Sequence, residues 1–227
     1  MKWLICVCLL CAFPGAAVAQ TDNARMEEMP LPKGLHGVVA YNSIGFSFVP
    51  RSAESPAWEI EVKQDLSGTY RVKDGVPVPI SISAATMKRL NIGDSKVNSG
   101  QCETKQKNIA QTGTKTIFYS LGPALSHCTF NYSDDEDLNA AAATFQSIAE
   151  TIQAGDKLKH KHRFDHLGLD AELDSLLARA KDGGAIELQN IAPILKSIVE
   201  DDEIMSPSRR KAKSLLELAG IHMEPGA

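Results

Sequence analysis

The chain has 227 residues, of which 43% are hydrophobic and 23% are charged, and its formal net charge is −4. These values are ordinary for a globular protein with a hydrophobic core. The mild acidity argues against a dedicated nucleic-acid binder, which would carry a basic domain or stripe. We therefore expect no nucleic-acid partner.

The first 19 residues have the three parts of a secretory signal peptide. Lys2 gives a positively charged start, Trp3 to Phe13 form an apolar run, and Ala17-Val18-Ala19 is a small-residue cleavage site. The apolar run is too short to span a bilayer comfortably. The pattern predicts cleavage before Gln20, so that the protein is secreted or periplasmic and has no membrane span after cleavage.

Two of the five cysteines would remain in the exported chain. Cys6, Cys8 and Cys11 lie within residues 1–19, which leaves Cys102 and Cys128. In an oxidising compartment, two remaining cysteines most simply form one disulfide. The alternative is a pair of buried free thiols.

Residues 20–35 are polar and have no periodicity, which is typical of a flexible leader. Residues 36–133 then have the patterns of antiparallel strands. Trp58-Glu59-Ile60-Glu61-Val62 alternates apolar and polar residues, as a strand with one wet face does. Ser83 is placed to cap a short helix that ends at Leu90, and Gly122-Pro123 is the turn of a hairpin. The other predicted strands are Val38–Tyr41, Ile44–Val49, Tyr70–Val72, Ile80–Ile82, Thr116–Ser120 and His127–Tyr132.

Residues 134–221 have the patterns of a helical bundle, and residues 222–227 are a tail. Ser133-Asp134-Asp135-Glu136 is a capping box, which predicts a helix with Ser133 as its N-cap and Gly155 at its end. Another helix has Ser206 as its predicted N-cap, Pro207 as its first residue, and Gly220 after its end. Two further helices are predicted over Asp170–Lys181 and Glu187–Glu200. In the second, Pro193 either kinks the helix or lies at the start of a helix that begins near Ala192.

Two parts of the chain resemble known protein types. In the last two predicted helices, five residues stand in places that the HEAT-type helix pair favours: Pro193, Asp201, Arg209, Ala212 and Leu215. The segment resembles one such pair, which implies a helix hairpin, whereas a solenoid needs three or more repeats. The strand order of residues 36–133 resembles that of small exported inhibitors of metalloproteases, which implies a protease-inhibitor-like module.

A histidine-rich segment is the candidate metal site. If it is helical, His162 and His166 lie four residues apart on one face, and Asp165 is a nearby carboxylate. A metal-dependent hydrolase that uses His160, His162 and His166 is therefore the alternative function. Three cations in the segment would repel a metal ion: Lys159, Lys161 and Arg163. The competing interpretation is a polar connecting segment in which Arg163 and Asp165 form salt bridges.

Aromatic residues in the β-rich part are the candidate interface. Strand alternation places most of them in the core, and any that stay exposed together would mark a partner surface. The candidates are Phe46, Phe48, Trp58, Tyr119 and Tyr132.

The combined prediction is an α+β protein, with an N-terminal antiparallel β-rich part that contains one disulfide and a C-terminal helical bundle. Whether the two parts form one domain or two stays open. We expect an exported, non-catalytic binding or envelope interaction protein whose partner is another exported or envelope protein. The sequence has neither a nucleotide-binding glycine loop nor a G-x-S-x-G elbow, so we expect no cofactor.

Overall fold

A computed structural model describes residues 42–52, 54–93, 96–97, 102–104 and 110–223. Three predicted segments lie outside this part of the chain: the signal peptide over residues 1–19, the leader over residues 20–35, and the strand Val38–Tyr41. Most of the tail, residues 224–227, also lies outside it. No helix within the described residues is long and apolar enough to cross a membrane.

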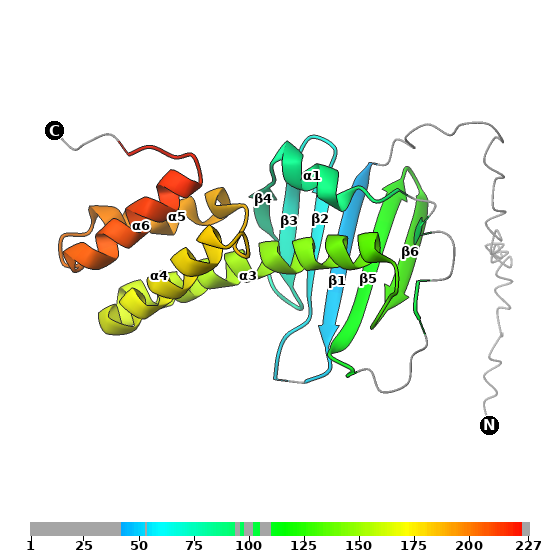
Figure 1. Cartoon of the computed structure of the whole chain (residues 1–227), viewed down its shortest axis with the longest axis horizontal. Coiled ribbons are helices and arrows are strands. Elements are labelled where there is room, and N and C mark those ends of the chain that lie inside the picture. The colour runs from blue at the N-terminus through cyan, green and yellow to red at the C-terminus, as the bar shows by residue number, and fades with distance from the viewer. Residues whose placement is uncertain (1–41, 53, 94–95, 98–101, 105–109, 224–227) are drawn as a thin grey trace, which may run out of the picture. The chain divides into compact units, whose positions relative to one another are not determined.

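In the described part, six strands form one antiparallel sheet in the order β4-β3-β2-β1-β5-β6 (Figure 1). The strands are β1 (Ser43–Pro50), β2 (Trp58–Lys63), β3 (Ser67–Val72), β4 (Val78–Ser81), β5 (Gly113–Leu121) and β6 (Ala124–Phe130). In β2, Trp58, Ile60 and Val62 are buried, as their alternation predicts. The predicted antiparallel β-rich part is therefore confirmed.

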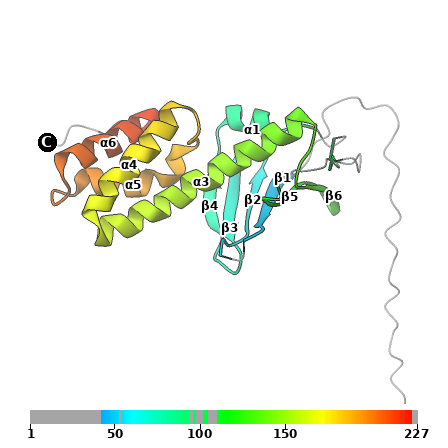
Figure 2. The same ribbon diagram turned by 60° about the horizontal axis from the view of Figure 1, so that its bottom comes forward.

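The helices follow the sheet in the chain, apart from one short helix within the β-rich part. They are α1 (Ala84–Leu90), α3 (Glu136–Phe164), α4 (His166–Lys181), the 3₁₀ helix η1 (Leu188–Ile191), α5 (Ala192–Glu200) and α6 (Ser206–Leu218). Helix α3 crosses one face of the sheet, and α1 lies on the same face (Figures 1 and 2). Together with the sheet, these helices confirm the predicted α+β class.

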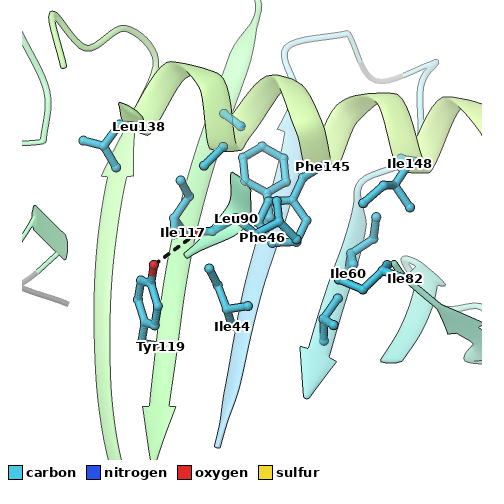
Figure 3. Close-up of a cluster of buried hydrophobic side chains, with 14 of the residues drawn as sticks. Ile44, Phe46, Ile60, Ile82, Leu90, Ile117, Tyr119, Leu138, Phe145 and Ile148 are labelled. Atoms are coloured by element: carbon cyan, nitrogen blue, oxygen red, sulfur yellow. Dashed lines mark hydrogen bonds between the residues drawn. The ribbon is translucent and has the colours of Figure 1, made fainter. Parts of the chain in front are cut away.

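The N-terminal half of α3 closes the core over the sheet (Figure 3). Phe145 of α3 stacks on Phe46 of β1, with ring centroids 5.3 Å apart and an interplanar angle of 9°. Tyr119 of β5 is 3% exposed, and its hydroxyl donates to the Leu90 carbonyl oxygen at 3.4 Å and accepts from the Ile92 N–H at 3.1 Å. These bonds satisfy the one polar atom that Tyr119 brings into the core.

A second hydrophobic cluster lies among the helices. Its members include Leu158, Leu169, Leu173, Leu195 and Leu215, all fully buried or nearly so. Because Leu138 to Ile152 belong to the sheet cluster and Leu158 to the helical one, α3 contributes to both. One helix therefore ties the two clusters together.

A polar junction also joins the sheet side to the helices; it consists of Ser81 and Ser83 on one side and Glu187, Gln189 and Asn190 on the other. The Glu187 carboxylate accepts from the Ser83 N–H at 3.0 Å and from the Ser83 hydroxyl at 2.8 Å. The Asn190 side chain accepts from the Ser81 N–H at 2.8 Å and donates to the Ser81 carbonyl at 2.9 Å. Glu187 is 8% exposed, so these bonds replace the water that its charge loses on burial.

Helix α3 differs from its prediction at both ends. Its N-cap is Asp135, whose carboxylate accepts from the N–H groups of Asp137 at 2.9 Å and Leu138 at 3.2 Å. Ser133 is instead buried, and its hydroxyl accepts from the Asp135 N–H at 3.2 Å. Gly155 does not end the helix, which runs for 29 residues to Phe164. Gly155 lies against Ile191 of η1, where an added Cβ would meet Ile191 Cγ2 at 2.4 Å, so its role is close packing.

The later helices keep their predicted order with shifted starts. Helix α4 begins at His166, four residues before the predicted Asp170, because Asp165 caps it through the Gly168 N–H at 2.8 Å. Pro193 lies in the first turn of α5, which confirms the second of the two alternatives for this residue. The N-cap of α6 is Met205, one residue before the predicted Ser206, and Gly220 follows the helix with φ 73°.

The predicted disulfide between Cys102 and Cys128 is present, with Cα atoms 5.8 Å apart. Both cysteines are buried, at 5% and 2% exposure. The bond joins the segment before β5 to the edge strand β6. It confirms the disulfide and excludes the free-thiol alternative for this structure.

Candidate binding groove

A groove of about 810 Å³ lies between α3 and the strands β1 to β3. Its floor contains Phe48, Trp58, Tyr70 and Val72. The rings of Phe48 and Trp58 have centroids 5.9 Å apart, and those of Trp58 and Tyr70 are 6.2 Å apart. Neighbouring rings in tilted contact hold one another in place, so the floor is a preformed apolar surface.

One stripe of α3 forms the facing wall of the groove. Its members recur at helical spacing: Gln146, Ala149, Glu150, Gln153, Asp156, Lys157, His160 and Lys161. Residues at this spacing lie on one face of a helix. At 1.5 Å per residue, the wall is about 22 Å long.

The side-chain amides supply the directional polar groups of this wall. Gln153 Nε2 donates to the Tyr70 hydroxyl at 3.0 Å. Burial raises the pKa of Tyr70, so the phenol stays neutral and the floor stays uncharged at neutral pH. The Gln153 amide also carries an acceptor oxygen and a second N–H, and Gln146 brings a second amide to the same wall.

Charges on the rim of the groove are mostly balanced by neighbours. Glu150 forms a salt bridge with Arg179 of α4, and Lys161 forms one with Glu172 at 2.9 Å. Asp156 accepts from Lys159 at 2.9 Å. The groove therefore combines an apolar floor, amide donors and acceptors, and a rim with little net charge.

The predicted aromatic interface does not form one exposed patch. Phe46, Trp58 and Tyr119 are 0%, 9% and 3% exposed, because their positions in the strands face α3 and α1. Phe48 and Tyr132 are partly exposed. Of the five, Phe48 and Trp58 line the groove, while Phe46 and Tyr119 belong to the core beneath the helices.

The histidines do not share one helix, contrary to the spacing argument. Asp165 has φ −151° and ψ 78°, so it breaks the helical path between His162 in α3 and His166 in α4. His162 Nε2 lies 2.9 Å from Asp201 Oδ2, and His166 Nε2 lies 3.0 Å from the His162 carbonyl oxygen. The Glu203 N–H, with His162 as a smaller cause, holds the pKa of Asp201 below its usual value.

Each predicted ligand thus has its own partner within the fold: Asp165 caps α4, and the ring of His160 packs on Phe164 with centroids 5.1 Å apart. Within the described residues, no group of three or more His, Cys, Asp and Glu side chains could hold a metal ion. Arg163 lies over the Phe164 ring at 5.1 Å, and it forms no salt bridge with any residue that the structure describes. The hydrolase alternative stays a prediction, and elemental analysis of the purified protein for zinc tests it.

The polar wall of the groove was not predicted from the sequence. A stripe of glutamines and charges beside the buried stripe of α3 is visible in the sequence, but solvated helix faces have the same pattern. This stripe becomes a wall because the end of β1 and the residues Pro50, Ser52, Ser55 and Pro56 face it across the groove. That proximity arises from tertiary packing alone.

No known protein family matches this sequence, and no curated protein gives a significant match to it.

Proposed function

We propose that this is an exported, secreted or periplasmic, binding protein that holds an extended apolar segment of another exported protein in the groove. The groove between α3 and β1–β3, with its aromatic floor, is the observation that carries the proposal. Its volume of about 810 Å³ is within the range of ligand pockets, which extends from about 300 to 1,000 Å³.

The length and polarity of the wall favour a polypeptide over a compact small molecule. About 22 Å of helix matches six or seven residues of extended chain at about 3.3 Å each. Gln146 and Gln153 can both donate and accept, as the alternating N–H and C=O groups of a peptide require. Apolar side chains of the segment would contact Phe48 and Trp58, while its backbone bonds to the amides.

Site-specific crosslinking tests this assignment. A photoreactive residue replaces Gln146 in the full chain, which is produced in the cells that export it. The matched control replaces Ala143, which is exposed on α3 and does not line the groove. We expect a crosslinked polypeptide from position 146 and none from position 143, identified by mass spectrometry.

A blocking variant gives the quantitative arm of the same test. Gln146→Trp fills the groove, whereas Ala143→Trp adds the same ring one turn of α3 before the groove. Capture of the crosslinked partner should fall by about tenfold or more for Q146W, because losing a buried apolar contact costs about 1.4 kcal/mol or more. Equal capture by Q146W and A143W, or equal crosslinking from both positions, would contradict the proposal.

A further inference from the structure

An apolar pair is exposed where α3 meets α4, at the end of α3 that is remote from the sheet (Figures 1 and 2). Phe164 ends α3 with 66% of its surface exposed, and Leu167, in the first turn of α4, is 80% exposed. We call Phe164, Leu167 and the charged residues around them the α3–α4 corner. The two residues are only three positions apart in the chain, and exposed apolar side chains that occur close together mark an interaction site more often than isolated ones do.

Basic residues precede this pair on α3. Arg163 lies over the Phe164 ring, and exposed Lys157 and Lys159 lie on the two preceding turns of α3. Lys159 is paired with Asp156, whereas Lys157 and Arg163 form no ion pair within the described residues. The acidic group closest in sequence is Asp165, and its carboxylate is bonded to the Gly168 N–H as the cap of α4.

We propose that the α3–α4 corner binds the surface of an anionic lipid bilayer. Phe164 and Leu167 would enter the boundary between headgroups and acyl chains, and Lys157 and Arg163 would reach the lipid phosphates. Apolar insertion combined with basic flanking residues is the physical basis of peripheral membrane binding. The long aliphatic stems of lysine and arginine let the charge stay at the headgroup level while the stem contacts apolar surface.

A bilayer fits the shape of the corner better than a folded protein surface does. Phe164 and Leu167 come from two successive helix ends and are not among the residues that line the groove. A rigid protein partner would need a complementary cavity for them, whereas a bilayer admits protruding side chains without one. The inference does not need a peptide in the groove, because the inserting residues Phe164 and Leu167 lie outside its lining, although Lys157 belongs to both surfaces.

Vesicle flotation with the full chain tests the inference. The probes are vesicles of phosphatidylethanolamine with phosphatidylglycerol, and neutral vesicles of phosphatidylcholine. The insertion variant is Phe164→Ser with Leu167→Ser, and the charge variant is Lys157→Gln with Arg163→Gln. The matched control is Leu125→Ser with Leu218→Ser, which removes two leucines that are 62% and 52% exposed elsewhere. All four proteins are purified from the exported fraction and have the same N-terminus, so they differ only at the substituted positions.

The wild type and the control should float with anionic vesicles, and high salt should weaken this binding. The insertion variant should bind on the order of a hundredfold more weakly, since two apolar side chains no longer leave water. The charge variant should lose about thirtyfold, because each cation at an anionic surface contributes about fivefold. Circular dichroism shows whether the variants keep their helical content.

Three results would overturn the inference. They are no flotation of the wild type, equal flotation with neutral vesicles, and insertion variants that bind as well as the control. A protein crosslinked through the α3–α4 corner of the wild type, without vesicle binding, would assign this surface to a protein partner instead.

Discussion

At the residue scale, Gly155 shows how one missing side chain sets the approach of two elements. A glycine inside an exposed helix costs about 1 kcal/mol relative to alanine, so Gly→Ala would normally stabilise. Here the new Cβ would meet Ile191 Cγ2 at 2.4 Å, and Ile191 is 4% exposed. We expect Gly155→Ala to lower the free energy of unfolding by about 1–3 kcal/mol, as overpacking does. Urea denaturation measures the change.

A double-mutant cycle identifies the cause. Ile191→Ala removes Cγ2, the closest atom to the new Cβ, and leaves Ile191 Cβ at 3.0 Å, so Gly155→Ala should cost less in that background. If Gly155→Ala stabilises the wild-type background, the close packing of α3 on η1 is contradicted.

At the scale of elements, a charged tie joins α4 to α6. Asp170 Oδ1 accepts from the Ser208 hydroxyl at 2.7 Å and from Lys211 Nζ at 2.9 Å. The hydrogen bond from Lys211, with that from Ser208, lowers the pKa of Asp170 from its ordinary value of 3.8. A carboxyl group with a lowered folded-state pKa stabilises the fold above its unfolded pKa, and this contribution disappears as the pH falls through the folded-state value.

The lowered pKa of Asp170 predicts how the stability of Asp170→Asn depends on pH. At neutral pH the variant should unfold at lower urea concentration than the wild type, and the difference should narrow as the pH falls below 3.8. The comparison variant is Asp174→Asn, whose carboxylate is 59% exposed and contacts Lys211 from the solvent side. Its effect should be smaller at every pH. If the difference in stability between Asp170→Asn and the wild type does not depend on pH, the proposed contribution of the Asp170 carboxylate is contradicted.

At the scale of the whole molecule, helix α3 and the polar junction hold the two hydrophobic clusters in one structure. Glu187→Gln keeps the size of the side chain but removes the charge that accepts from Ser83. We expect a loss of about 1.5–3 kcal/mol, the range for hydrogen bonds to a charged group. The junction joins segments that lie about a hundred residues apart in the chain.

Two probes follow the two clusters during unfolding. Emission of Trp58 reports the sheet cluster, because Trp58 is the one tryptophan outside residues 1–19. Far-ultraviolet circular dichroism reports mainly the helices. The two urea transitions should coincide in the wild type. They should separate in Glu187→Ala, because α3 is then the main remaining connection between the two hydrophobic clusters. Separate transitions in the wild type would contradict cooperative unfolding.

The sequence by itself determined the features that depend on neighbouring residues or on counting. Local stereochemistry decides the alternation in Trp58–Lys63, the cap at Ser83 and the order of the helices, so all three were predictable. The Cys102–Cys128 pairing was predictable because these are the only two cysteines outside residues 1–19. The same local rules misplaced both ends of α3, as well as the starts of α4 and α6. Glycine is a residue that often ends a helix, but Gly155 lies inside α3 and packs against Ile191. Serine is a common N-cap, but the N-cap of α3 is Asp135 and not Ser133.

Only the tertiary structure decided which surfaces meet. The groove exists because α3 lies against the ends of β1 to β3, and no rule of spacing places residue 153 beside residue 70. His162 and His166 were separated by a break at Asp165, whose carboxylate stabilises α4 as its cap. Patterns in sequence report each residue's preference for its own helix or strand, whereas the groove and the polar junction depend on contacts between residues far apart in the chain.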